Sequence, residues 1–333
     1  MMHKWITDVI NSPKRIAIPI LTHPGIEMIG KTVWDAVTDG KVHAEAIKAL
    51  NERYPSAATT VIMDLTVEAE AFGCTINFQK DEVPTVSQRL VSSFDEIQQL
   101  AVPPLTAGRV PEYLLANQLT AASITDKPVL GGCIGPYSLA GRIFDMTEIM
   151  IAIYTEPDTI NLLLEKCTQF LTEYCRALKA SGVSGVVIAE PAAGLLSDDD
   201  CRQYSSLYVK QIVDALQDDS FSVFLHNCGN TGQCTKAMLY TGAHGYHFGN
   251  AMNMVEALET CPKNVLVMGN LDPVSVFKMS TPEQVKQAAK NLLEKTVGYK
   301  NFVLSSGCDV PPHTSLENVE AFYEALAEFN NNL

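Results

Sequence analysis

The chain has 333 residues, of which 47% are hydrophobic, and it carries a formal net charge of −14 at pH 7. This length and hydrophobic content allow a large core and fit either two ordinary domains or one α/β barrel. The acidic balance argues against nucleic acid, anionic membrane surfaces and substrates with many carboxylates, and it favours small or neutral ligands.

The first segment, residues 1–14, carries Ile6, Val9 and Ile10 at helical spacing and predicts an N-terminal helix. It has neither an apolar region of signal-peptide length nor a cleavage site, and no run in the chain approaches the ~20 apolar residues that cross a bilayer. Nine cysteines without a secretory signal are expected to be reduced thiols or metal ligands. We therefore expect a cytoplasmic protein with no membrane partner.

Short apolar runs that alternate with helical patterns predict the fold. Those expected to be strands lie at 16–21, 60–63, 129–130, 183–189, 221–225, 245–248, 265–268 and 302–304. Eight alternating units predict an α/β protein of the (β/α)8 TIM-barrel type, although a doubly wound open sheet stays possible. Because no linker or low-complexity stretch interrupts the pattern, residues 1–333 are expected to form one domain.

Several helix starts can be predicted from capping signals. Ser197 is expected to cap the helix after the fourth strand, and Thr281 with Gln284 forms a capping box with Pro282 at the first helical position. Thr314 and Glu317 predict the same device for the last helix. The segment 65–127 is too long for one unit and is expected to be an insertion after the second strand, over the barrel mouth.

Polar residues follow several predicted strands, where active sites of such barrels lie. Asp64 and Glu190 end the second and fourth strands and are candidates for general acid or base groups, although strand-end carboxylates also cap helices and hold loops. Asn250 and Asn270 end the sixth and seventh strands and are candidates for binding a cofactor. His244 and His247 straddle the sixth strand and are expected to be structural.

His226 and Cys228 end the fifth strand, and Cys308 follows the eighth. Residues i and i+2 of a strand point to the same face, so His226 and Cys228 can reach one ion, and the two strand ends can meet across the barrel opening. Two cysteines and one histidine provide three ligands, which is typical of a catalytic zinc site with one open position. The alternatives are that these cysteines are merely buried, or that Cys234 replaces one of them.

The predicted ligand set also indicates a type of chemistry. Two thiolates cancel the charge of the zinc ion and make it a weak Lewis acid, but a further thiolate bound to it stays electron-rich. Such a site suits the activation of a thiol nucleophile, whereas hydrolytic zinc sites prefer histidine and carboxylate ligands.

Five segments are distinctive as motifs, namely MDLTVEAEAFG at 63–73, GPYSLA at 135–140, HNCGNT at 226–231, GNLDP at 269–273 and SGCDVPP at 306–312. With these motifs the chain resembles the uroporphyrinogen decarboxylase superfamily nearly end to end. It is similar to the cobalamin-dependent branch that includes methylcobalamin:coenzyme M methyltransferases.

The resemblance implies a TIM barrel in which His226, Cys228 and Cys308 bind zinc. It further implies that a zinc-bound thiol such as coenzyme M takes a methyl group from methylcobalamin, with cobalt(I) as the leaving group. The corrinoid would be held by a separate carrier protein docked over the barrel mouth.

Other functions in and beyond the superfamily stay open. The decarboxylases carry an arginine-rich motif after the first strand, whereas residues 22–28 contain no arginine here, although Asp64 matches their important aspartate. A methylcobalamin:tetrahydrofolate-type methyltransferase, transfer in the opposite direction and a noncatalytic corrinoid- or thiol-binding protein are further alternatives.

Overall fold

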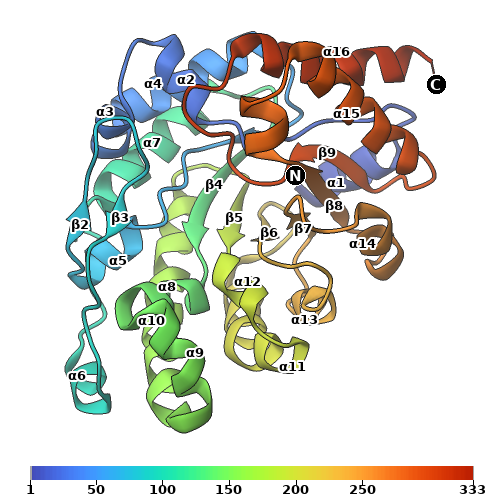
Figure 1. Cartoon of the computed structure of the whole chain (residues 1–333). Helices are drawn as coiled ribbons and strands as arrows, with labels where there is room; N and C mark the ends of the chain where they lie inside the picture. Colours follow the sequence, from blue (N-terminus) through green and yellow to red (C-terminus); the bar gives the residue numbers. More distant parts are fainter. Residues whose placement is uncertain (1, 333) are drawn as a thin grey trace.

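The computed structural model describes residues 2–332 and shows an α/β fold around a curled parallel sheet (Figure 1). Seven strands lie side by side in chain order: β1 (Thr59–Thr60), β4 (Val129–Ile134), β5 (Gly185–Ala189), β6 (Ser222–Asn227), β7 (Gly245–Phe248), β8 (Leu266–Leu271) and β9 (Phe302–Ser306). Each pairs in parallel with the next. This order never reverses, which excludes the doubly wound alternative, because that fold reverses its strand order at a switch point.

The segment 16–18 connects the two edges of the sheet. Ala17 forms a parallel bridge with Leu304 of β9, and the Ile18 amide donates to the Leu304 carbonyl at 3.0 Å. On the other side, the amide of Ala57, two residues before β1, donates to the Ala17 carbonyl at 3.0 Å. The predicted first strand is therefore present as one bridge rather than a ladder, and the fold is TIM-barrel-like.

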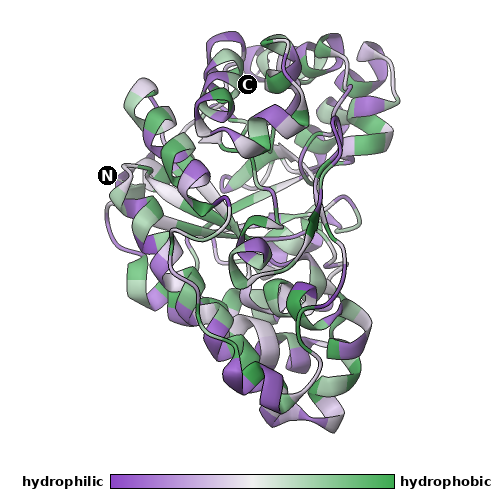
Figure 2. Ribbon diagram, turned by 90° about the vertical axis from the view of Figure 1, so that its left-hand side faces the viewer, coloured by the Kyte–Doolittle hydropathy of each residue, from purple (hydrophilic) through white to green (hydrophobic). Residues whose placement is uncertain are grey.

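Helices surround the sheet. They are α1 (Met2–Asn11), α2 (His23–Met28), α3 (Val33–Thr38), α4 (Gly40–Arg53), α5 (Val67–Phe72), α6 (Phe94–Gln99), α7 (Val110–Ser123), α8 (Pro136–Phe144), α9 (Met146–Thr155), α10 (Pro157–Ala180), η1 (Pro191–Leu195), α11 (Asp198–Cys201), η2 (Arg202–Ser206), α12 (Leu207–Leu216), α13 (Thr235–Tyr240), α14 (Met254–Thr260), η3 (Pro273–Lys278), α15 (Pro282–Lys295) and α16 (Leu316–Asn331). Most carry hydrophobic and hydrophilic residues in alternation along their length, as expected when one face is buried (Figure 2).

The predicted helix starts are confirmed except at the last helix. Ser197 caps α11, and Thr281 with Gln284 forms the capping box of α15. At α16 the cap is Ser315, not Thr314, because the Thr314 hydroxyl instead donates to the Pro311 carbonyl at 2.8 Å.

The predicted N-terminal helix, α1, packs against the barrel interior. Its residues Met2 and Ile6 belong to a buried cluster with Ile18, Leu130 and Phe224, of which Leu130 and Phe224 lie in the first halves of β4 and β6. The opposite end of the barrel, where the strands finish, is therefore left for the site.

The segment 65–127 contains much more than one strand–helix unit. It holds α5, the hairpin of β2 (Ile76–Asn77) and β3 (Thr85–Val86), α6 and α7. Its α7 packs on α4. That this segment covers the barrel mouth, and that residues 1–333 form one domain, stay predictions.

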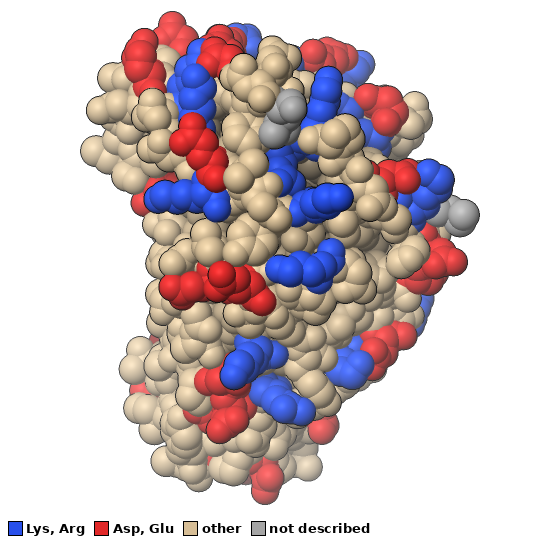
Figure 3. All heavy atoms as spheres, turned by 90° about the vertical axis from the view of Figure 1, so that its right-hand side faces the viewer, with Lys and Arg blue, Asp and Glu red and all other residues tan. Residues whose placement is uncertain are grey.

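Charged residues of both signs are mixed over the surface. Lys and Arg alternate with Asp and Glu on the face turned to the right of Figure 1 (Figure 3). Between α15 and α16, Lys286 and Lys290 each lie 2.5 Å from Glu328. Over residues 2–332, no helix combines the length and the apolar character required to cross a membrane.

Candidate metal centre

Three potential metal ligands meet at the ends of β6 and β9. One ligand atom each from His226, Cys228 and Cys308 lie within 4.8 Å of one another. His226 is buried, and both cysteines are half-buried. The fold thus brings together the three residues that the sequence pattern singles out, although eighty positions separate Cys228 from Cys308.

The loop after β7 lies between the loops that carry Cys228 and Cys308. A Cβ atom at Gly249 would lie 2.5 Å from the Cys228 carbonyl oxygen and 2.7 Å from its Cα. A Cβ atom at Gly307 would lie 2.6 Å from the Asn250 amide nitrogen. The two glycines are needed for close backbone approach, and that approach holds Cys228 and Cys308 near each other.

A chain of hydrogen bonds fixes the tautomer of His226. Ser305 Oγ donates to the Ile18 carbonyl at 2.7 Å, so it accepts from His247 Nε2 at 2.8 Å. His247 Nδ1 must then accept from His226 Nδ1, which lies 2.7 Å away. Burial, and then the proximity of His226, hold the pKa of His247 well below its usual value, so its ring stays neutral. The lone pair of His226 is therefore on Nε2.

These atoms fit a zinc ion. His226 Nε2 is buried and, within residues 2–332, has no hydrogen-bond partner, as expected of an atom that binds a metal. The contact with Cys308 lowers the pKa of Cys228 to about 7, against the effect of burial, and the same contact raises the pKa of Cys308, against a smaller effect of the nearby His226. One nitrogen and two sulfur ligands match the three-ligand zinc sites that keep a fourth position open.

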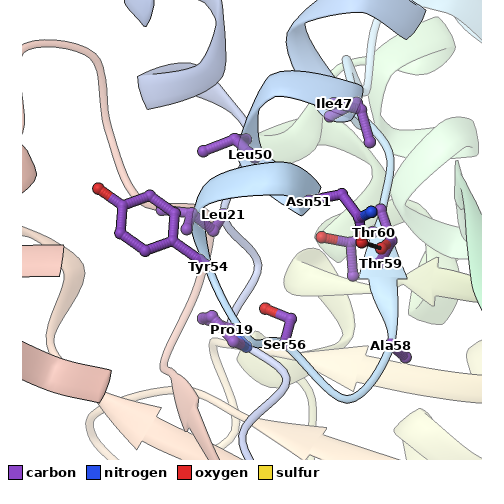
Figure 4. A pocket seen from close by; sticks show the side chains of 10 residues that line it. All are labelled: Pro19, Leu21, Ile47, Leu50, Asn51, Tyr54, Ser56, Ala58, Thr59 and Thr60. Atoms are coloured by element: carbon purple, nitrogen blue, oxygen red, sulfur yellow. Dashed lines mark hydrogen bonds between the residues drawn. The ribbon is translucent and has the colours of Figure 1, made fainter. Parts of the chain in front are cut away.

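A cavity of about 60 Å³ adjoins the three ligands. Besides His226, Cys228 and Cys308, it is lined by Ile20, Met63, Leu65, Ala189, Pro191 and Asp309. A second cavity, between α4 and residues 56–60, has only about 20 Å³, roughly the space of one water molecule (Figure 4). There Thr59 Oγ1 donates to Asn51 Oδ1 at 3.2 Å. The first cavity, which adjoins the three potential metal ligands, is the candidate site.

Asp309 is a site residue that the sequence reasoning missed. Its two carboxylate oxygens accept from Thr22 Oγ1 at 2.7 and 3.0 Å, and His23 Nδ1 lies 3.2 Å from one of them. The available signal was its position directly after Cys308 in the 306–312 motif.

Glu190 contacts a helix rather than the ligand cluster. Its Oε1 accepts from the Tyr137 amide at 2.9 Å, and its Oε2 accepts from the amide and hydroxyl of Ser138 at 2.9 and 2.6 Å. Burial raises its pKa to about 7, against the effect of these hydrogen bonds. The geometry matches the helix-capping alternative, and a role in proton transfer or metal binding stays a prediction.

Asp64 also has both oxygens occupied. Oδ1 accepts from the amide and hydroxyl of Thr66, and Oδ2 accepts from Arg109 at 2.5 Å. Arg109, from the 65–127 segment, also pairs with Glu70 at 2.6 Å. Asp64 is not part of the cavity wall, which its neighbours Met63 and Leu65 line. Its catalytic role stays a prediction.

The two asparagines hold loops near the site. Asn270 Nδ2 donates to the carbonyls of Gly249 and Met252 at 2.8 and 2.6 Å, which fixes the loop after β7. Asn250 is exposed and donates to Asp272 at 3.0 Å. Cofactor binding by either stays a prediction.

Cys234, the possible substitute ligand, points elsewhere. Its thiol donates to the carbonyls of Ala193 and Leu196 at 3.4 and 3.3 Å. The cluster of His226, Cys228 and Cys308 does not include it.

Several known proteins are similar to this chain in sequence or in fold. The family described as Uroporphyrinogen decarboxylase (URO-D) matches residues 12–329. A methylcobamide:CoM methyltransferase, MtbA of Methanosarcina acetivorans, is 30% identical over 82% of this chain and 80% of its own length. A uroporphyrinogen decarboxylase of Alcanivorax borkumensis is 24% identical over 84% and 81%. The solved structure of a methyltransferase from Methanosarcina mazei has the same fold, with a TM-score of 0.88 and 24% identity over 98% of both chains.

Proposed function

The chain belongs to the uroporphyrinogen decarboxylase (URO-D) family, and we propose that within it the protein is a zinc-dependent, corrinoid-linked methyltransferase. It would transfer a methyl group between methylcobalamin, held by a corrinoid carrier protein, and a small thiol. The observation that carries this proposal is the cluster of His226, Cys228 and Cys308, in which the buried Nε2 of His226 has no hydrogen-bond partner among the described residues. Relatives with methyltransferase names support it.

The three side chains would hold zinc through His226 Nε2 and the two Sγ atoms, leaving one position open toward the cavity. Zinc so bound would keep an incoming thiol in its thiolate form without removing its nucleophilicity. Ile20, Met63 and Leu65 line the cavity and limit the water that can solvate that sulfur. His247 and Ser305 keep the Nε2 lone pair directed at the ligand position.

The decarboxylase alternative has less support from the contacts. Residues 22–28 contain no arginine that could hold an acidic tetrapyrrole, and Thr22 and His23 there are bound to Asp309. Both oxygens of Asp64 are occupied by Thr66 and Arg109. We further expect the protein to work in the cytoplasm, where its nine free cysteines would stay reduced.

Metal analysis of the purified protein tests the proposal, with wild type beside Cys308→Ala. We expect about one zinc per wild-type chain and none in the variant. The buried Cys261, which lies outside the cluster, gives the matched control Cys261→Ala, which should keep its zinc.

Formation of cobalt(I) from methylcobalamin with a panel of thiols should then require the zinc-loaded protein. Full transfer by metal-free Cys308→Ala would refute the proposal. Decarboxylation that is indifferent to zinc and lost in Asp64→Asn would favour the decarboxylase. Zinc and thiol binding without turnover would favour a noncatalytic binding protein, and transfer only to a folate acceptor would favour the tetrahydrofolate type.

A further inference from the structure

The wall of the cavity beside the three ligands is almost entirely apolar. Its residues other than the ligands are Ile20, Met63, Leu65, Ala189, Pro191 and Asp309. Of the residues 2–332 that the structure describes, no lysine or arginine lines it. A molecule that enters therefore meets one charged side chain besides the ligands, and that side chain is a carboxylate.

The histidine beside Asp309 is already bound to it. His23 Nδ1 lies 3.2 Å from the Asp309 carboxylate, and the same ring hydrogen-bonds the backbone of Val310. Burial acts to lower the pKa of His23, but the charge and hydrogen bond of Asp309 raise it overall, with a smaller contribution from Glu27. His23 and Asp309 form a closed pair, so His23 offers no charge to a second anion.

Arg109 is equally unavailable. It is bound to the carboxylates of Asp64 and Glu70 at 2.5 and 2.6 Å. Asp64 lies between the wall residues Met63 and Leu65 in the sequence. Its guanidinium also donates to the Val37 carbonyl. Arg109 is not part of the cavity wall, and a buried cation already held by two carboxylates is not free to pair with a ligand there.

The size of the cavity keeps a ligand's polar end close to this wall. A dry cavity of about 150 Å³ is large enough for benzene. The cavity here has about 60 Å³, so only a few non-hydrogen atoms fit beside the ligands. On a two-carbon thiol, a terminal acidic group would lie in the cavity or at its rim, near Asp309.

We infer that the acceptor thiol carries no anionic group and that Asp309 is the residue that selects against anionic thiols. The inference rests on the proposed function and narrows it. Coenzyme M, the acceptor in the names of the methyltransferase relatives, bears a sulfonate. In this cavity the sulfonate would lose water, meet no lysine or arginine among the described wall residues, and lie beside the Asp309 carboxylate, all of which weaken binding.

The test compares 2-mercaptoethanol with 2-mercaptoethanesulfonate, which differ only in a hydroxyl or a sulfonate at the far end. Thiol binding is followed in cobalt(II)-substituted protein by the thiolate-to-cobalt absorption band, which does not depend on turnover. Methyl transfer from methylcobalamin is measured separately with the zinc-loaded protein. We expect the neutral thiol to bind at least about tenfold more tightly, and its kcat/KM to be higher by a similar factor.

Two variants assign the selectivity to charge. Asp309→Asn keeps the shape of the side chain and an acceptor for Thr22. It should reduce the preference for 2-mercaptoethanol over 2-mercaptoethanesulfonate to about threefold or less. Leu65 is partly exposed on the cavity wall, so Leu65→Lys can place a cation there and should reverse the preference toward the sulfonate. Leu65→Met, similar in volume and uncharged, is the matched control and should retain the wild-type preference.

The outcomes separate this inference from the proposed function. Equal or tighter binding of the sulfonate by wild type would overturn the inference, and the methyltransferase proposal would stand if transfer occurs. A preference for the neutral thiol without any transfer would support the selectivity of the cavity and refute the proposed function. A cobalt spectrum that neither thiol changes would overturn both.

Discussion

His226 Nδ1 lies 2.7 Å from Nδ1 of His247, and through this contact a residue of β7 orients the proposed metal ligand on β6. The two histidines are register partners in the sheet. Their contact continues through Ser305 on β9 to the Ile18 carbonyl, so three strands and the 16–18 segment determine which nitrogen of His226 carries its proton.

Replacing His247 tests this arrangement. His247→Leu removes the acceptor for His226 Nδ1–H and should weaken zinc binding by about 10- to 100-fold, whereas His247→Gln supplies an amide oxygen and should restore most of the affinity. Zinc affinity is measured by competition with a chelator. In metal-free protein with 15N-labelled histidine, NMR should show the Nδ1–H tautomer of His226 in wild type and its loss in His247→Leu. Equal affinity in the two variants would contradict the positioning role.

The glycine at 249 should be intolerant of a methyl group. Gly249→Ala would push the loop after β7 away from Cys228 and should cost about 1–3 kcal/mol in the free energy of unfolding, together with weaker zinc binding. Gly298 has no heavy atom within 4 Å of an added Cβ, so Gly298→Ala should change stability by less than about 1 kcal/mol and leave zinc binding unchanged. Urea unfolding and metal analysis of both variants check this prediction. Similar behaviour of the two variants would contradict the need for close backbone approach at Gly249.

Glu68 should make stability depend on pH. Burial raises its pKa to about 7, and its Oε2 is buried with no partner among the described residues. Because the folded pKa is raised, the favourable contribution is complete below about pH 4.5 and is lost as the pH rises to about 7.

Glu68→Gln stays uncharged at every pH. Its stability relative to wild type should therefore rise by about 3 kcal/mol between pH 4.5 and 7, as measured by urea unfolding. Glu190 should cause a similar trend in both proteins, so only their difference is diagnostic. A difference that does not vary with pH would show that Glu68 titrates normally.

Glu190→Gln distinguishes a helix cap from a proton or metal partner. As a cap of α8, the Glu190 side chain accepts hydrogen bonds from Tyr137 and Ser138. In the variant, the NH2 group of the glutamine would face one of these donors and could not accept from it. The free energy of unfolding of the variant should be about 1–3 kcal/mol lower than that of wild type, whereas its zinc affinity should be unchanged. Loss of zinc at unchanged stability would instead assign Glu190 to the site.

The sequence allowed the strand ends and the ligand cluster to be predicted for a physical reason. Continuous apolar runs identify strands buried on both faces, and parallel strands finish at the same edge, so His226, Cys228 and Cys308 were expected to meet. The direction in which a strand-end carboxylate points could not be predicted in the same way. Glu190 turns to the amides at the start of α8, and Asp64 to Arg109 of a distant segment, neither of which is encoded near the strand itself.

Two partners of the site could not be predicted, because they depend on sheet register. His247, which was expected to be structural, contacts His226, because the two residues pair across neighbouring strands. Asp309 contacts Thr22 and His23, which lie nearly the whole chain away from it. Local spacing contains no information about such neighbours.

The pairing of segment 16–18 with β9 bears on when the site can form during synthesis. Ala17 has no strand to bridge until Leu304 has been made, and Asn330 exchanges hydrogen bonds with the backbone of Arg15. A ribosome-bound chain that stops before residue 302 would present His226 and Cys228 without Cys308 and with an open sheet edge. Binding of the proposed zinc ion by all three residues would then have to follow the synthesis of Cys308, and a bound ion would mark a chain in which residues 15–18 can already pair with the C-terminal part.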